Sequence, residues 1–153
     1  MEIEARLAAL SLTLPEPPRP VASYVPAAQV GDLLFLSGTT CYKDGKFLFV
    51  GRVGAEVTLD QGYQAARQTA LNLLSVIKAT VGDLDRVQRF VKLNGYVNSA
   101  PDFDRQPEVI NGASDLLEQL YGERGKHART AIGVSDLPSH IPVEIELIVQ
   151  ISQ

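Results

Sequence analysis

An arginine and a glutamate late in the chain have the residue types and the spacing for acid–base chemistry on a small carboxylate. Arg129 opens one strand-like segment, and Glu144 lies in a second one, Val143-Glu144-Ile145-Glu146. If these segments are neighbouring antiparallel strands, a fixed cation lies near a carboxylate. Arg129 could then grip a substrate carboxylate through a bidentate fork while Glu144 orients a water or a proton. A structural interpretation stays open, namely a cross-strand ion pair or an arginine that reaches solvent at the sheet rim.

Other reactive side chains are few. The two histidines, His127 and His140, and the single cysteine, Cys41, show no ligand spacing of i, i+3 or i, i+4, so no structural zinc site is expected. The chain has neither a phosphate-binding glycine loop nor the G-x-S-x-G turn of serine hydrolases. Both histidines lie in or beside predicted loops, and we expect them to be surface residues.

Helices are indicated by apolar residues at helical spacing. The longest helix is predicted over residues 59–81, with Thr58 as its N-cap. A second helix carries an apolar stripe over residues 109–120. A short helix and a Pro-rich arm are predicted for residues 1–20, so that residues 21–153 form the single domain.

Strands are indicated by apolar runs and by alternation. The continuous apolar run 33–36 predicts a strand buried on both faces. Asp44-Gly45 is typical of a hairpin turn. Further strands are predicted over residues 87–97, 129–134 and 143–151, and in the last of these apolar and polar residues alternate.

These elements predict an α+β fold of two layers. Two amphipathic helices can cover only one face of a sheet, so we expect a two-layer sandwich in which both helices lie on the same face of a mixed sheet. The opposite face would present Glu144, Glu146, Lys92 and Asn94 among apolar residues. A semi-polar face of this kind is usually covered by another subunit, which predicts a cyclic homo-oligomer.

Length and charge limit the class of protein. A chain of 153 residues is expected to form one domain with a full hydrophobic core. The net charge of −4 disfavours nucleic acid as a partner, because an acidic surface repels phosphates. No apolar run approaches the roughly 20 residues that cross a membrane, and a lone cysteine fits a reducing compartment. We therefore expect a cytoplasmic protein without a membrane partner.

Four separated segments together resemble one known family, the RidA/YjgF family of reactive-intermediate deaminases, also labelled endoribonuclease L-PSP. The resemblance covers the chain from about Val21 to the C-terminus. The C-terminal segment carries Ala128-Arg129-Thr130, Leu137-Pro138 and Val143-Glu144-Ile145-Glu146, and the other three segments are Ser23-Tyr24-Val25, Gly31-Asp32-Leu33-Leu34-Phe35-Leu36-Ser37-Gly38 and Val109-Ile110-Asn111-Gly112.

The resemblance implies a chorismate-mutase-like (ferredoxin-like) fold assembled as a homotrimer, with active sites in clefts between subunits. Members of the archetypal branch hydrolyse 2-imino or enamine acids to 2-keto acids and ammonia, and they use no cofactor or metal. By the same resemblance, Arg129 would bind the substrate carboxylate and Glu144 would position the attacking water. The other implied pocket residues are Tyr24, Ser37, Asn111 and Ala131, the last through nearby backbone groups.

The chain departs from the archetypal pattern at residue 131, which is alanine where that branch has a cysteine, so any role of that thiol is absent. Tyr24 and Ser37 could instead pack a subunit interface, and Asn111 could be an ordinary polar residue near a helix N-terminus. A non-catalytic protein that binds small carboxylates on the same trimer is the alternative function. Ribonuclease activity is disfavoured by the acidic charge, and chorismate mutase activity is suggested by fold likeness alone.

Overall fold

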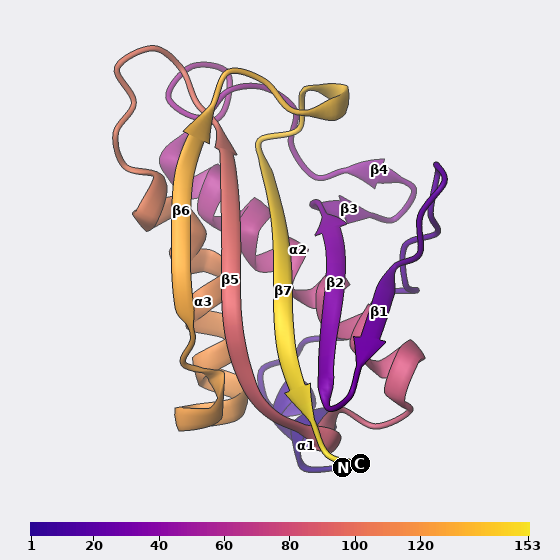
Figure 1. Ribbon diagram of the computed structural model, residues 1–153. Coiled ribbons are helices and arrows are strands. Elements are labelled where there is room, and N and C mark those ends of the chain that lie inside the picture. Colours follow the sequence, from indigo (N-terminus) through magenta and orange to yellow (C-terminus); the bar gives the residue numbers. More distant parts are fainter.

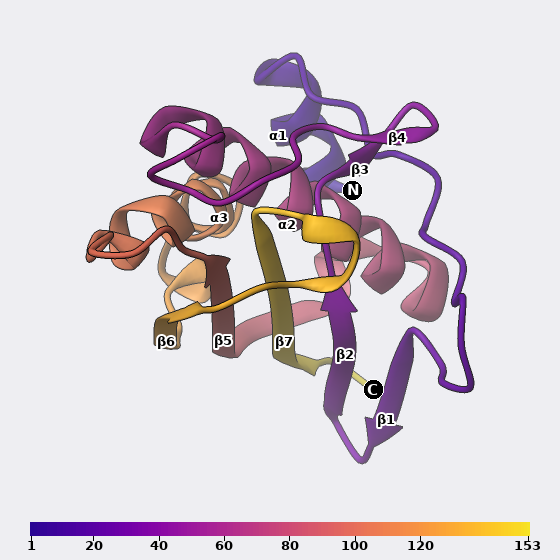
Figure 2. The same cartoon turned by 90° about the horizontal axis from the view of Figure 1, so that it is seen from above.

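The computed structural model describes residues 1–153 and contains a five-stranded sheet with two long helices on one face (Figure 1). Viewed from above, sheet and helices form two layers (Figure 2). Neighbouring strands are antiparallel except β5 and β6, which are parallel. The predicted two-layer α+β sandwich is confirmed. Its strands follow the spatial order β1 (Ala27–Val30), β2 (Leu33–Thr39), β7 (Val143–Ile151), β5 (Val87–Asn98) and β6 (Ala128–Val134), and its long helices are α2 (Leu59–Val81) and α3 (Gln106–Tyr121).

Helix α2 has the predicted bounds because both of its ends carry strong local signals. The Thr58 hydroxyl accepts a hydrogen bond from the Gln61 N–H at 3.1 Å, and the Gln61 side chain accepts one from the Thr58 N–H at 3.0 Å. This capping box satisfies two backbone donors that the first turn leaves unpaired. Directly after the last turn, Gly82 takes a φ of 85°, which glycine adopts without steric cost.

The core lies between the sheet and the two long helices. Leu93 of β5 and Ile145 of β7 are fully buried there. The helices approach each other closely at Gly112 of α3, where a Cβ would lie 2.0 Å from the backbone oxygen of Tyr63 in α2. Only glycine fits at this point. The apolar stripe predicted for the second helix is buried as expected: Val109, Ala113, Leu116, Leu117 and Leu120.

The predicted N-terminal helix is α1 (Glu2–Ala9), and it packs against the body of the domain. Ile3 and Leu7 belong to the main core, and the Arg6 side chain donates to the Leu120 carbonyl at 2.6 Å. No helix in the chain combines the length and the apolar composition that a bilayer crossing requires.

Strand β2 is not buried on both faces, contrary to the expectation. Leu34 and Leu36 point toward the helices and are buried, whereas Phe35 between them is 41% exposed. The reason is that α2 and α3 cover only one side of the sheet. The uncovered side, here called the open face, therefore presents apolar as well as polar side chains.

The hairpin turn at Asp44-Gly45 is confirmed, since the two residues take φ values of 51° and 83°. Its strands, β3 (Tyr42–Lys43) and β4 (Lys46–Phe47), are short and form a separate two-stranded sheet. Strand β1 was not predicted. The dipeptide Gly31-Asp32 joins it to β2, and such a two-residue turn is a hairpin signal that would have revealed it.

Candidate functional site

Arg129 is the second residue of the edge strand β6, and its side chain faces helix α3. The guanidinium Nη1 donates to Asn111 Oδ1 at 2.7 Å and to Ser114 Oγ at 3.2 Å. Both acceptors lie on one face of α3 because they are three residues apart. Nε and Nη2 donate to no group of the chain, and no carboxylate lies within ion-pair distance. A half-buried cation thus keeps two of its three nitrogens free for an anion.

Ala131 lies two residues farther along β6 and therefore on the same face of the strand as Arg129. The register pairs Arg129 with Leu93 and Ala131 with Gly95 of β5, and Leu93 is buried under the helices. Arg129, Asn111 and Ala131 are thus brought together at the outer edge of the sheet on its helix side. We call this set the helix-face half-site.

Glu144 occupies the opposite face of the sheet. It is half-buried and alternates with Val143 and Ile145, which are fully buried toward the helices. Its partner across the antiparallel pair is Tyr96 of β5. The carboxyl group therefore projects from the open face, where no helix covers it.

Ser37 lies on β2, the strand that pairs with the strand of Glu144. Ser37 lies at the irregular end of β2, and its hydroxyl donates to the Val25 carbonyl at 2.6 Å, which ties the segment carrying Tyr24 to this strand. The next residue is Gly38, where a Cβ would lie 2.9 Å from Glu144 Oε1. Glycine at this position leaves room for the carboxyl group. Ser37 and Glu144 form the second set, which we call the open-face half-site, and Tyr24 adjoins it in sequence through Val25.

The expectation that Arg129 and Glu144 lie on neighbouring antiparallel strands is wrong. Strand β5 lies between β6 and β7, and β6 pairs with it in parallel. The β5 partners of the two residues, Leu93 and Tyr96, are three positions apart and so project from opposite faces of the sheet. Within one chain, the two side chains form neither a shared site nor a cross-strand ion pair.

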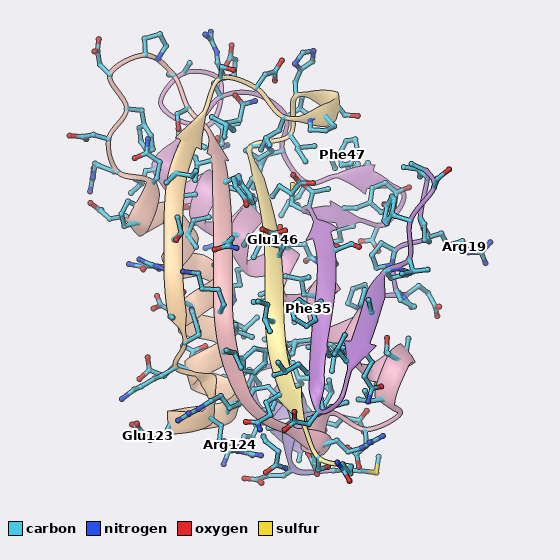
Figure 3. The ribbon with its side chains drawn as sticks, in the orientation of Figure 1. Arg19, Phe35, Phe47, Glu123, Arg124 and Glu146 are labelled. Carbon is cyan, nitrogen blue, oxygen red and sulfur yellow. The ribbon has the colours of Figure 1, made fainter.

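Two carboxyl groups on the open face differ in their surroundings. Glu146 Oε1 accepts hydrogen bonds from Asn94 Nδ2 at 3.0 Å and from the Tyr96 hydroxyl at 2.8 Å, whereas Glu144 has no such donor. Figure 3 shows Glu146 and Phe35 on the side of the sheet that faces away from the helices. Burial raises the pKa of Glu144 above its ordinary value, and the neighbouring charge of Glu146 raises it further. Its raised pKa suits Glu144 to accept a proton.

The sequence analysis missed Ser114 and misplaced His127. His127 is half-buried rather than a surface residue, with Nε2 2.9 Å from Ser114 Oγ and Nδ1 2.7 Å from the Gly125 carbonyl oxygen. No motif identifies this pair. The available signal was the spacing: Ser114 follows Asn111 by three residues on α3, and His127 precedes Arg129 by two residues just before β6. His140 is exposed as expected and pairs with Asp136 at 2.9 Å.

Two cavities of about 300 and 540 Å³ lie elsewhere on the chain, and none of the six predicted site residues lines either of them. The smaller cavity is lined by polar residues and glycine near the loop that contains Asp136 and His140. The larger one lies between residues 11–15, the β3–β4 turn and α2. The two half-sites are thus separate from both cavities.

Comparisons with known proteins identify the family. The family described as "YjgF/chorismate mutase-like, putative endoribonuclease" matches residues 4–145. Protein TCP17 of Trypanosoma cruzi is 42% identical over 151 residues, which cover 98% of this chain and 94% of that protein. A 2-iminobutanoate/2-iminopropanoate deaminase of Dermatophagoides farinae is 28% identical over 145 residues, covering 92% of this chain and 94% of the relative.

Among solved structures, the crystal structure of a protein of unknown function from Agrobacterium tumefaciens superposes with a TM-score of 0.91. It is 43% identical, and the match covers 98% of this chain and 92% of that one. The family match extends over residues 4–145 and thus over nearly the whole length. The chain therefore belongs to the YjgF/chorismate-mutase-like family.

Proposed function

We propose that the protein hydrolyses 2-imino or enamine acids to 2-keto acids and ammonia in clefts between the subunits of a homotrimer. The observation that carries this proposal is the state of Arg129, which is half-buried, oriented by the neutral oxygens of Asn111 and Ser114, and without a carboxylate partner. Such a guanidinium binds a carboxylate through two parallel hydrogen bonds. The similarity to an iminobutanoate/iminopropanoate deaminase supports the choice of reaction.

The opposite placement of the half-sites supports an active site shared by two subunits. The open-face half-site contains the carboxyl group of Glu144 but no cation. The helix-face half-site contains the cation Arg129 but no carboxyl group. If the β6 edge of one copy packs against the open face of the next, Arg129 and Glu144 complement each other. This contact also buries exposed apolar side chains of the open face, such as Phe35 and Val30. It joins two different surfaces, so repeating it builds a ring when the rotation between copies closes; the family resemblance implies three copies.

In the proposed reaction, Arg129 fixes the carboxylate of the imino acid, and its charge leaves the adjacent C=N carbon electrophilic. Glu144 accepts a proton from a water as the water oxygen bonds to that carbon, and the C=N double bond becomes a single bond. That proton then passes to the nitrogen, which gives a carbinolamine. Glu144 next takes the hydroxyl proton and passes it to the nitrogen, so that the C–N bond breaks, ammonia leaves and the oxygen forms the keto group. The outer edge of β6 pairs with no strand, so backbone groups near Ala131 are available to the imine side. The step needs positioning and one proton carrier, without a covalent intermediate.

The proposal is tested by measuring the hydrolysis of several 2-imino acids generated in place by an amino-acid oxidase, in a buffer free of amines. We expect the protein to accelerate the loss of imine and to release keto acid and ammonia in equal amounts. Light scattering should give three times the chain mass. A folded trimer that accelerates no substrate but binds 2-oxobutanoate in calorimetry would replace the deaminase with the non-catalytic binding protein. A trimer that does neither would refute the site.

The pH dependence of kcat should report the raised pKa of Glu144. Because Glu144 must be unprotonated to accept a proton, kcat rises with pH through its pKa. Replacing Glu146 with glutamine removes the neighbouring negative charge and lowers the pKa of Glu144, so the rise of kcat should move to lower pH. The matched control is Glu123→Gln, in the turn after α3 and far from the open face (Figure 3). Identical profiles for Glu146→Gln and wild type would contradict the coupling.

A further inference from the structure

A chain of hydrogen bonds leads away from Arg129 to the backbone at Gly125. Arg129 Nη1 lies 3.2 Å from Ser114 Oγ, which lies 2.9 Å from His127 Nε2, and His127 Nδ1 lies 2.7 Å from the Gly125 carbonyl oxygen. The direction of every bond is determined by its ends. A carbonyl oxygen only accepts, so Nδ1 carries the imidazole proton, and Nη1 only donates, so the Ser114 oxygen accepts from it. The Ser114 hydroxyl is then free to donate to Nε2.

This arrangement requires a neutral imidazole, because a protonated Nε2 could not accept. Burial lowers the pKa of His127, and the charge of Arg129 lowers it further, although the bond to the Gly125 carbonyl and the charge of Glu118 act in the opposite direction. No carboxylate lies within ion-pair distance of the ring. The neutral form therefore persists at neutral pH, and the chain of donors and acceptors keeps one direction.

The hydrogen-bond chain fixes the orientation of the guanidinium. The other Nη1 hydrogen is donated to Asn111 Oδ1 at 2.7 Å, so both hydrogens of Nη1 are bound to acceptors on α3. Two bonds from one nitrogen hold the plane of the group as well as its position, because the guanidinium is flat and rigid. What remains free is the edge with the Nε and Nη2 hydrogens, whose parallel directions match a carboxylate.

We propose that Ser114 and His127 are positioning residues, which hold Arg129 so that its Nε/Nη2 edge receives the carboxylate of the 2-imino acid. The inference rests on the proposed function and extends it to two side chains that contact no substrate. His127 lies two residues before Arg129 on the same side of the chain, and Ser114 lies one helical turn after Asn111. The hydrogen bond between Ser114 and His127 thus connects α3 to the start of β6, next to the arginine that binds the carboxylate.

The test compares Ser114→Ala and His127→Asn with the wild type. Asparagine can keep the donor to the Gly125 carbonyl but lacks the Nε2 acceptor, so both variants break the same link. The reaction does not alter the substrate carboxylate, so its binding to Arg129 contributes to the ground state and the transition state alike. Poorer orientation of the guanidinium should therefore raise KM for the imino acid about tenfold and leave kcat within about twofold of the wild-type value. The Kd of 2-oxobutanoate, measured by calorimetry, should rise by the same factor. Ser114→Thr retains the hydroxyl and should restore wild-type values.

The double variant Ser114→Ala/His127→Asn should be no worse than either single variant, because the two side chains act through one link. Unchanged KM and Kd in both single variants, beside an active wild type, would overturn the positioning role and leave the deaminase intact. A parallel fall of kcat and melting temperature without rescue by threonine would also overturn it, in favour of a merely structural role. A wild type that neither turns over imino acids nor binds 2-oxobutanoate would remove the proposed function, and this inference with it.

Discussion

Replacing Arg129 with alanine is expected to lower kcat/KM for 2-imino acids by about 100- to 1000-fold. The loss corresponds to about 3–4 kcal/mol, which is typical when one partner of a charged, doubly hydrogen-bonded pair is removed. No other side chain can take over, because the neighbours of the guanidinium, Asn111 and Ser114, are neutral. The measurement is the imine-hydrolysis rate across a range of substrate concentrations.

Two further variants show whether the loss of kcat/KM in Arg129→Ala is due to the loss of carboxylate binding by the guanidinium. Arg129→Lys keeps the charge but not the planar fork, so it should lie between wild type and Arg129→Ala. Arg19→Ala removes an exposed arginine that points away from the domain, and its activity should equal that of the wild type (Figure 3). The molar mass of Arg129→Ala should be unchanged. A monomeric or unfolded Arg129→Ala would mean that Arg129 is structural, and full activity would mean that the carboxylate binds elsewhere.

A one-to-one mixture of Arg129→Ala and Glu144→Gln subunits is expected to regain about a quarter of the wild-type activity, although each variant alone is nearly inactive. Glu144→Gln removes the proton acceptor, which usually lowers kcat by about 100-fold or more. In a randomly mixed ring, about one site in four combines an intact Arg129 from one subunit with an intact Glu144 from the next. The activity of the mixture after joint refolding is the measurement.

The same mixture separates the two possible origins of the site. If Arg129 and Glu144 of one chain acted together, no subunit in the mixture would carry both, and no activity would return. Native mass spectrometry of differently tagged subunits shows whether hybrid assemblies have formed. Hybrids without activity would refute the shared site, and recovery above that of both parents would establish it.

Local signals in the sequence predicted the helices and their buried faces well. The Thr58–Gln61 capping box and Gly82 each lie within a few residues of the helix end that they determine in α2. The apolar stripe of α3 follows from helical spacing alone. The motifs likewise pointed to the residues of both half-sites. Each of these features depends on near neighbours in the sequence, which a pattern can reveal.

The pairing of strands could not be read in the same way. Alternation identifies β6 and β7 as strands, but the insertion of β5 between them depends on how the whole chain is arranged. The prediction therefore placed Arg129 beside Glu144, when the register puts them on opposite faces. Ser114 and His127 were missed for a related reason, since their contact joins α3 to the start of β6 and has no sequence motif.

If the two halves of the active site lie on opposite faces of one sheet, only associated subunits form a complete site. Specific activity then measures how far the subunits are associated. When such a protein is diluted until its subunits separate, each Arg129 loses the Glu144 of the neighbouring subunit. No chain has to unfold for this to happen. Activity per milligram would then fall with dilution and return on concentration, and a ligand that bridges both halves would oppose the fall by mass action. In the proposed assembly, the amount of the protein would thus set its active fraction.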